Sequence, residues 1–284
     1  MCALFLSGEE EYMITSSSNA QIKKVQQILK KAKTRREEGL FAVEGVKMFR
    51  EAPAERIEKV YVSESFSAKE ECGEVLAEKG LDGPGGQKVE IVEDRVFKSL
   101  SDTVTPQGVL CLIRMQNRRL EGLLAGDAAG GGSCAVLEDL QDPGNLGTII
   151  RTGEGAGVTG VILSRTSVDV YNPKVIRSTM GSIYRMPVLY VDSIAEEVLP
   201  LLKEREIRTY AAHLKGKHTY DRENYEKGTA FFIGNEGNGL TDELTAQADT
   251  LIRIPMEGSV ESLNAAMASG ILMYEASRQR RNIN

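Results

Sequence analysis

The sequence predicts an α/β protein. Short apolar segments, typical of buried strands, alternate with segments of helical periodicity along nearly the whole chain. The length of 284 residues suits two modest domains or one large one. Residues 115–133, rich in Arg, Gly and Ala, divide the alternation in two and are predicted to be a linker. We therefore expect domains at 14–114 and 134–284, after a disordered extension at 1–13.

A basic amphipathic helix is expected to open the first domain. Ser16, Ser17 and Ser18 offer N-caps for it. Five apolar residues then follow at helical spacing: Ile22, Val25, Ile28, Leu29 and Ala32. Further along, strands are expected at 40–43, 57–62, 89–92 and 108–113, with helices at 45–51 and 68–79. The glycine-rich residues 80–87 are predicted to be a loop.

The second domain has stronger apolar strands. They are expected at 135–137, 160–163, 188–191, 208–212, 230–233 and 251–254. Helices fall between them, and a last helix is expected at 262–278. Because these strands are apolar without alternation, they favour a mostly parallel sheet that helices cover on both faces.

Charge is distributed unevenly along the chain. The net charge of −6 and the pI of about 5.3 argue against broad affinity for nucleic acids. Residues 12–36 nevertheless contain no acidic residue and seven basic ones: Lys23, Lys24, Lys30, Lys31, Lys33, Arg35 and Arg36. This segment is either a phosphate-binding surface, with Lys23, Lys24, Lys30 and Lys31 as its RNA contacts, or a solvated helix face.

Cysteine and histidine are too sparse to indicate a metal site or a nucleophilic triad. The four cysteines, at positions 2, 72, 111 and 134, form no C-x-x-C pair, and only His213 and His218 are present. Buried, inert thiols in a reducing cytoplasm are the favoured interpretation. No apolar run reaches the roughly 18 residues of a membrane helix, and the N-terminus lacks the basic start of a signal peptide.

Three polar turns follow predicted strands of the second domain. They are residues 142–158 (D-P-G-N-L-G-T-I-I-R-T-G-E-G-A-G-V), 234–240 (G-N-E-G-N-G-L) and 254–268 (I-P-M-E-G-S-V-E-S-L-N-A-A-M-A). Turns at the carboxyl ends of parallel strands are where α/β proteins bind ligands. One such turn alone would be read as a plain loop, but three in one domain indicate a site. The P-loop and G-x-G-x-x-G spacings are missing, so neither a P-loop ATPase nor a dinucleotide enzyme is indicated.

These segments resemble the three motifs of the SpoU/TrmH family of RNA 2′-O-ribose methyltransferases. N-L-G-T-I-I-R, F-F-I-G-N-E-G-N-G-L and I-P-M-E-G-S-V-E-S-L-N-A-A-M-A stand in family order within residues 135–279. The first half resembles the family's substrate-binding extension, a small ribosomal-protein-like α/β domain. Its marks are S-N-A-Q-I-K-K (18–24), F-A-V-E-G-V-K (41–47) and T-P-Q-G-V (105–109).

The resemblance implies a SPOUT-type fold with a deep trefoil knot near the C-terminus and a homodimer with its active site close to the subunit interface. It implies S-adenosyl-L-methionine (SAM) as the cofactor, held in the knot mainly by backbone groups. By motif position, four residues would line the cofactor pocket: Gly234, Ile254, Met256 and Leu263. The resemblance also implies an RNA partner, no membrane and a cytoplasmic location.

By the same resemblance, the active site consists of Asn145, Arg151, Glu236, Ser262 and Asn264. Family proposals have Arg151 activate the 2′-hydroxyl, but a guanidinium stays protonated and can instead grip a phosphate and the developing alkoxide. Glu236 is expected to orient Arg151 or the ribose rather than to act as a base, and the alternative is a capping carboxylate. Asn264 could be a plain helix-start residue, and Ser262 only an N-cap.

The RNA substrate is less sharply defined. Lys174 and Arg177, in a further polar segment, either touch RNA phosphate or lie on a solvated helix. Two-domain members of the family often act on large-subunit ribosomal RNA. The resemblance therefore favours 23S ribosomal RNA over transfer RNA as the target of this protein. The alternatives are a tRNA methyltransferase, a methyltransferase acting on protein or small molecules, and a non-catalytic RNA-binding or ribosome-assembly protein that retains the fold.

Overall fold

The structure, a computed structural model, describes residues 13–81, 88–101, 103–124, 132–260 and 262–281. Two compact units meet in the sequence at residues 116 and 117, and the short segment 171–173 is grouped with the first unit. The expected extension at 1–13 and loop at 80–87 fall almost entirely outside the described residues. Each unit is an α/β layer structure around its own sheet.

The sheet of the first unit has four strands in the order β1-β4-β2-β3. Their bounds are β1 (Leu40–Glu44), β2 (Ile57–Ser63), β3 (Val89–Val92) and β4 (Val109–Arg114). β4 runs antiparallel to both β1 and β2, whereas β2 and β3 are parallel. All four strands lie where the sequence predicts them, to within one residue at each end.

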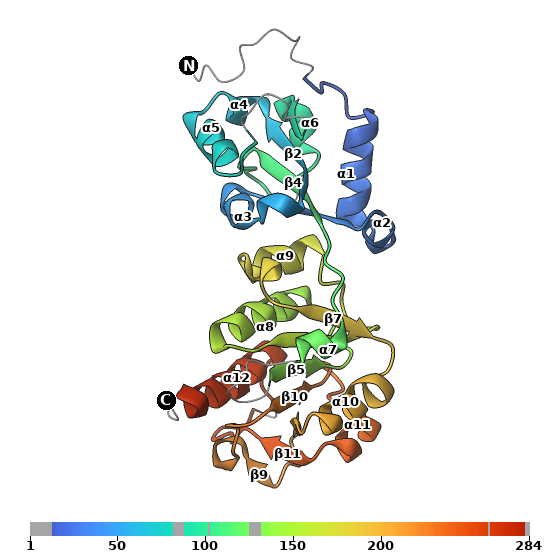
Figure 1. Cartoon of the computed structure of the whole chain (residues 1–284), viewed down its shortest axis with the longest axis vertical. Helices are drawn as coiled ribbons and strands as arrows, with labels where there is room; N and C mark the ends of the chain where they lie inside the picture. Colours follow the sequence, from blue (N-terminus) through green and yellow to red (C-terminus); the bar gives the residue numbers. More distant parts are fainter. Residues whose placement is uncertain (1–12, 82–87, 102, 125–131, 261, 282–284) are drawn as a thin grey trace. The chain divides into compact units, whose positions relative to one another are not determined.

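Helices cover both faces of this sheet (Figure 1). One core holds the apolar side of α1 (Ala20–Lys30) together with α6 (Asp94–Lys98). The other face carries α3 (Val46–Glu51), α4 (Glu64–Ser67) and α5 (Glu70–Ala77). A short 3₁₀ turn spans Ala54–Arg56. α4 and α6 were not predicted from the sequence, because each is only about one turn long and so few residues show no helical period.

The first helix differs from its prediction at both ends. Its N-cap is Asn19, whose Oδ1 accepts a hydrogen bond from Gln21 N at 2.8 Å, and not one of the serines. The helix also breaks at Lys31, after which α2 (Ala32–Glu38) begins. The buried Arg35 of α2 explains the break, because its guanidinium donates to the carbonyls of Ile28 and Leu29 at 2.6 and 3.0 Å. Arg35 is therefore a structural cap for the end of α1.

The second unit is built on a sheet of seven parallel strands in the order β7-β6-β5-β10-β8-β11-β9. Their bounds are β5 (Ser133–Leu137), β6 (Gly160–Ser164), β7 (Val188–Val191), β8 (Arg208–Ala212), β9 (His218–Thr219), β10 (Thr229–Ile233) and β11 (Thr250–Arg253). Only the two-residue β9 was not predicted. The predicted parallel α/β sheet is thus confirmed.

Helices cover both faces of the second sheet as well (Figure 1). α8 (Pro143–Ala156) and α12 (Ala265–Arg281) pack together on one face. The other face carries α10 (Leu199–Glu204), preceded by a π-helical turn at Ile194–Val198, and α11 (Asp242–Gln247). α9 (Pro173–Thr179) and two 3₁₀ turns, Ser182–Tyr184 and Tyr220–Arg222, complete the unit. Phe231 and Phe232 of the central β10 are both buried, as expected for a strand covered on its two faces.

The segment predicted as a linker has structure at its centre. Residues 120–123 form α7 (Leu120–Leu123), and Leu123 and Leu124 are buried in the core of the second unit. Residues 125–131 lie outside the described part of the chain. The composition of residues 115–133 predicted a flexible connection. The free energy gained by burying two adjacent leucines outweighs the conformational entropy lost when this segment is ordered.

Three cysteines are described, and all are buried: Cys72, Cys111 and Cys134. Burial raises the pKa of the Cys111 and Cys134 thiols to about 12. A thiol with so high a pKa carries almost no thiolate at neutral pH and is a poor nucleophile. The expected burial is confirmed for these three cysteines, and Cys2 lies outside the described residues.

Close packing between α8 and α9 depends on Gly147. A Cβ added at this glycine would lie 2.3 Å from Ser178 Cβ and 2.8 Å from the carbonyl oxygen of Val175. We expect Gly147→Ala to lower the free energy of unfolding by about 1–3 kcal/mol, the usual cost of overpacking. Thermal or denaturant unfolding followed by circular dichroism measures the change.

Gly122→Ala in α7 is the matched control, because a Cβ there meets no atom within 4 Å. Alanine favours a helix over glycine, so this variant should be as stable as the parent or slightly more stable. Equal unfolding midpoints for the two variants would contradict the close approach of α8 to α9.

Candidate active site

The turn between β5 and α8 supplies the first polar loop. Asp142 is the N-cap of α8, with its Oδ1 accepting from the backbone N–H of Asn145 at 2.7 Å. Pro143 follows in the first turn, where its missing N–H costs nothing. These two residues fix the start of α8 and place the side chain of Asn145 in its first turn, at the carboxyl edge of the sheet.

A carboxylate from the loop after β10 reaches this turn. Glu236 accepts three hydrogen bonds from it: from Gln141 N at 3.2 Å, from Asp142 N at 3.0 Å and from Asn145 Nδ2 at 3.0 Å. The two backbone N–H groups lie beside the N-terminus of α8, where a helix favours negative charge. Glu236 therefore ties the β10 loop to the start of α8.

The pKa of Glu236 reflects these contacts. Partial burial by itself raises the pKa, but the hydrogen bonds from Asn145 and from the backbone of Asp142 and Gln141 outweigh burial, and the net pKa lies below the ordinary value for glutamate. An ionised carboxylate with three donors is a weak proton acceptor at neutral pH. This geometry agrees with the expectation that Glu236 is no general base.

Asn264 extends the connection to the third loop. Its Nδ2 donates to Asn145 Oδ1 at 2.8 Å, and its Oδ1 accepts from the backbone N–H groups of Ala266 and Met267 at 2.9 and 3.2 Å. Asn264 is thus both the cap of α12 and a partner of α8. Glu236, Asn145 and Asn264 form one chain of hydrogen bonds that joins all three motif loops, and we call it the Glu236–Asn145–Asn264 chain.

The other expected site residues lie around this chain without being part of it. Ser262 is exposed, and α12 begins three residues later with Asn264 as its cap, so the N-cap interpretation of Ser262 is wrong. Ile254, Met256 and Leu263 are half-buried in the segment between β11 and α12. Gly234 ends β10 where the chain folds back sharply, because an added Cβ would lie 2.1 Å from the carbonyl carbon of Gly239.

Arg151 lies six residues beyond Asn145 on α8, about 9 Å further along the helix axis. Its side chain is exposed and has no hydrogen-bond or ion-pair partner among the described residues. The expected contact between Glu236 and Arg151 is therefore not formed in this structure. The carboxylate of Glu236 accepts instead from Asn145 and from two backbone N–H groups.

Two supporting contacts were missed by the sequence analysis. Glu138, directly after β5, accepts from Thr241 N at 2.7 Å and from Thr241 Oγ1 at 2.8 Å. Asn235 Nδ2 donates to the carbonyl of Asp139 at 2.8 Å, and Asp139 has a φ of +54°. These contacts hold both ends of the β10 loop against the end of β5. The carboxylate of Glu138 immediately after an apolar strand was the signal available in the sequence, whereas the contact of Asp139 uses a backbone carbonyl that no side-chain pattern marks.

The expected RNA contacts occupy two different helices. Lys23 and Lys30 are exposed on α1, as is Lys31 just after it, whereas Lys24 pairs with Glu38 at 2.6 Å. On α9, Lys174 is exposed and Arg177 is half-buried. These α9 residues are not members of the Glu236–Asn145–Asn264 chain, although α9 packs on α8 only two residues beyond Asn145.

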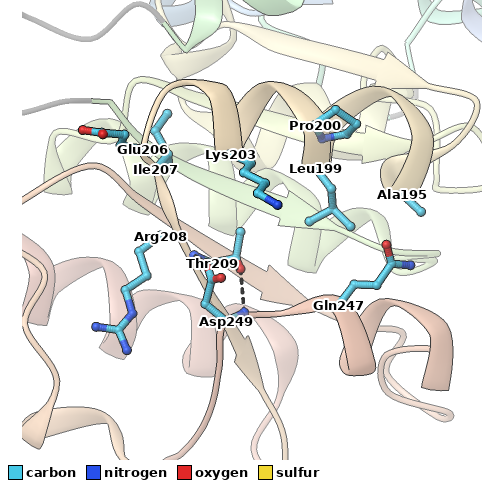
Figure 2. A pocket seen from close by; sticks show the side chains of 10 residues that line it. All are labelled: Ala195, Leu199, Pro200, Lys203, Glu206, Ile207, Arg208, Thr209, Gln247 and Asp249. Atoms are coloured by element: carbon cyan, nitrogen blue, oxygen red, sulfur yellow. Dashed lines mark hydrogen bonds between the residues drawn. The ribbon is translucent and has the colours of Figure 1, made fainter.

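A cavity of about 810 Å³ lies at the opposite edge of the second sheet (Figure 2). It is lined by α10 and by the amino ends of β8 and β11, including Lys203, Arg208 and Asp249. Ligands of parallel sheets bind at the carboxyl ends of the strands, so we do not assign this cavity to the candidate site. Among the described residues, no group of three or more His, Cys, Asp or Glu side chains is arranged to hold a metal ion.

Comparison with protein families agrees with this geometry. The model of the SpoU rRNA Methylase family matches residues 133–274, and that of an MRM3-like substrate binding domain matches residues 19–111. Over 281 residues the chain is 32% identical to an uncharacterized tRNA/rRNA methyltransferase of Synechocystis, covering 94% of each protein. Over 227 residues it is 30% identical to the 23S rRNA (guanosine(2553)-2′-O)-methyltransferase RlmP of Bacillus subtilis, covering 71% of this chain and 85% of that one.

Solved structures of SpoU and rRNA methyltransferases are also similar to this chain. The SpoU methyltransferase AviRb of Streptomyces viridochromogenes, in complex with AdoMet, matches with a TM-score of 0.80 at 26% identity over 93% of this chain and 98% of that one. An AdoMet-bound rRNA methyltransferase from Sinorhizobium meliloti matches with a TM-score of 0.78 at 28% identity over 94% and 97%. The chain belongs to the SpoU rRNA methylase family, and the predicted SPOUT-type fold is confirmed.

The carboxylate of Glu236 should stabilise the folded site in a pH-dependent way. Because its pKa is lower when folded than when unfolded, its contribution is present above the ordinary carboxyl pKa of about 4.3 and is lost as the pH falls through the folded value. We expect Glu236→Gln to lower stability at pH 7 and to differ progressively less from the parent as the solution is acidified towards pH 3. Unfolding curves at a series of pH values measure this.

Glu243→Gln, at an exposed position on α11, is the control and should show no comparable pH-dependent gap. A constant difference between the parent and Glu236→Gln across the whole series would show that the charge of Glu236 does not contribute.

Proposed function

We propose that this protein transfers a methyl group from SAM to a ribose 2′-hydroxyl of RNA, in 23S ribosomal RNA. The Glu236–Asn145–Asn264 chain carries the proposal, because it brings three motif loops, far apart in sequence, to one edge of the sheet. Membership in the SpoU rRNA methylase family and the AdoMet-bound structures of its relatives support the cofactor. The relatives named as 23S rRNA 2′-O-methyltransferases support ribosomal RNA and the ribose position.

The carboxyl edge of the second sheet has the chemistry that SAM requires. Ile254, Met256 and Leu263 are half-buried apolar side chains that would cover an adenine ring, and the sharp turn after Gly234 leaves backbone groups rather than side chains at the end of β10. When bound, SAM supplies a methyl group activated by a sulfonium. Loss of that positive charge on transfer favours reaction where apolar side chains cover the sulfonium.

The chain's own residues would position the ribose and stabilise its oxygen. Asn145 and Asn264 hold each other's amides in fixed orientations and so define a rigid edge for the ribose. The exposed guanidinium of Arg151 would bind the neighbouring phosphate and the developing 2′-alkoxide. Arg151 remains protonated, so it would act as an anion clamp while the hydroxyl proton leaves to solvent. Glu236 would act indirectly, by orienting Asn145.

We propose that the family's deep trefoil knot and homodimer also apply to this chain. β10 follows β8 in sequence yet lies between β5 and β8, so the chain returns to the middle of the sheet after β8, and this strand order is compatible with a knot. On α12, Met267 and Tyr274 are 60% and 48% exposed one heptad apart, with the half-buried Ile271 between them. Such an apolar stripe suits contact with a second copy.

The first unit would deliver RNA to this site. Three exposed lysines of the α1 segment, Lys23, Lys30 and Lys31, support a phosphate-binding role for that helix. The match of the unit to a substrate binding domain agrees with this role. No helix among the described residues is long and apolar enough to cross a membrane. We place the protein in the cytoplasm, where ribosomal RNA is available.

Incubation of the purified protein with tritiated methyl-SAM and a 23S rRNA transcript tests the function. We expect methyl incorporation, with the label on a ribose 2′-oxygen, and a fall of about 10²–10³-fold in rate for Arg151→Ala, the usual effect of losing an oxyanion donor. SAM affinity, measured by calorimetry, should be unchanged in this variant because Arg151 would touch only RNA.

Arg119→Ala, which removes an exposed arginine at the start of α7, should methylate at the parental rate. Label on a base would contradict the ribose assignment. Label on tRNA alone would contradict the ribosomal substrate. Absence of transfer to any RNA, with RNA binding intact, would leave the non-catalytic RNA-binding alternative.

The lysines of α1 should contribute to RNA affinity in a salt-dependent way. We expect Lys23→Ala with Lys30→Ala to weaken binding of the 23S transcript and to reduce the slope of log affinity against log salt by about 1.4, or 0.7 for each phosphate that a lysine no longer neutralises. Filter binding over a salt series measures the slope. The control replaces Lys69, exposed at the start of α5 on the other face of the sheet, and a change of slope as large as that of the double variant would remove α1 from the interface.

A further inference from the structure

The loop after β8 ends at the same edge of the sheet as the candidate active site. In the register of the sheet, Ala211 of β8 lies beside Phe232 of β10, and Ala212 lies beside Ile252 of β11. The next residues, His213 and Arg253, are therefore level with Gly234 at the carboxyl edge. Adjacent strands are about 4.8 Å apart, so Arg253 on β11 is roughly 10 Å from the end of β10.

Close backbone packing fixes this loop against β11. His213 N donates to the carbonyl of Ile252 at 2.9 Å, and Gly216 N donates to the carbonyl of His213 at 2.9 Å. Lys215 N donates to His213 Nδ1 at 3.1 Å. A Cβ on Gly216 would lie 2.7 Å from the carbonyl carbon of Ile252 and 3.0 Å from the nitrogen of Arg253. The residues flanking Gly216 are thus held directly over the Ile252–Arg253 peptide.

The flanking residues are both lysines. Lys215, Lys217 and Arg253 are all exposed, and none has an acidic partner among the described residues. Glu223 contacts His218 at 2.7 Å and Arg208 at 3.9 Å. It therefore does not neutralise Lys215, Lys217 or Arg253. We call these three cations the Lys215–Lys217–Arg253 cluster. In a chain with a net charge of −6, such a local excess of positive charge costs repulsion that an anion would relieve.

We propose that the Lys215–Lys217–Arg253 cluster binds the phosphates of the RNA strand next to the target nucleotide. The inference rests on the proposed function and adds a second RNA contact within the catalytic unit. Lys215 and Arg253 lie at the carboxyl edge of the sheet with the motif loops, and Lys217 precedes β9 at the level of Leu251, two residues from that edge. The cluster is thus close enough for nucleotides that flank the one in the site. Leu214, 66% exposed at the tip of the loop, adds an apolar contact for a base or sugar. Cations with fixed backbones position the strand, while the motif loops act on one ribose.

The test replaces the two lysines together, Lys215→Ala and Lys217→Ala. We expect the affinity for an unmodified 23S rRNA transcript to fall about tenfold at moderate salt, and the slope of log affinity against log salt to drop by about 1.4. KM for the transcript should rise while kcat at saturating RNA stays at the parental value. SAM affinity by calorimetry should not change.

The matched control replaces Lys203 and Lys227, two exposed lysines of α10 and the segment before β10 that belong to the amino edge of the same sheet. Equal RNA affinity and equal salt slopes in the two double variants would overturn the proposal. Loss of SAM affinity in the Lys215–Lys217 variant would also overturn it, by assigning the cluster to the carboxylate of the cofactor. If the parent protein transfers no methyl group, the proposed reaction fails, but the binding comparison still decides whether this surface holds RNA.

Discussion

The candidate active site depends on hydrogen bonds between one carboxylate and two side-chain amides. Asn145 donates to Glu236 and accepts from Asn264, and Asn264 in turn caps α12. Each polar group in the chain is the hydrogen-bond partner of the next. Removal of one side chain would leave its partner without a hydrogen bond and loosen the loop that carries that partner. Because these contacts join loops from three separate strands, they convert a set of exposed turns into one preorganised surface.

The parallel sheet provides the frame for that surface. Parallel strands place all their carboxyl ends at one edge, and the position of β10 between β5 and β8 brings the turn of Glu236 beside the start of α8. Glu138 and Asp139 then pin the β10 loop at both its ends. Close approach at Gly147 brings α9 onto α8 near the same edge. The site is rigid because strong backbone elements, and not loops alone, define it.

Three sets of exposed cations stand out on the surface of this acidic protein. The lysine face of α1, the exposed Arg151 and the Lys215–Lys217–Arg253 cluster each present cations towards solvent. Within the second unit, Arg151 and the Lys215–Lys217–Arg253 cluster would favour an RNA whose phosphates fit both surfaces at once. This arrangement suits an enzyme that must select one nucleotide from a large folded RNA.

Sequence alone determined the strands, the parallel class of the second sheet and the three motif loops, because apolar period and turn residues are local properties. It did not determine which polar groups meet. Glu236 and Asn145 are 91 residues apart and Asn264 and Asn145 are 119 apart, so only the folded sheet decides that they bond to each other and leave Arg151 exposed. Burial of Arg35 under α1 and the fixing of the 213–217 loop over β11 were likewise set by tertiary packing. A side chain's partner depends on distance in space, which local pattern does not encode.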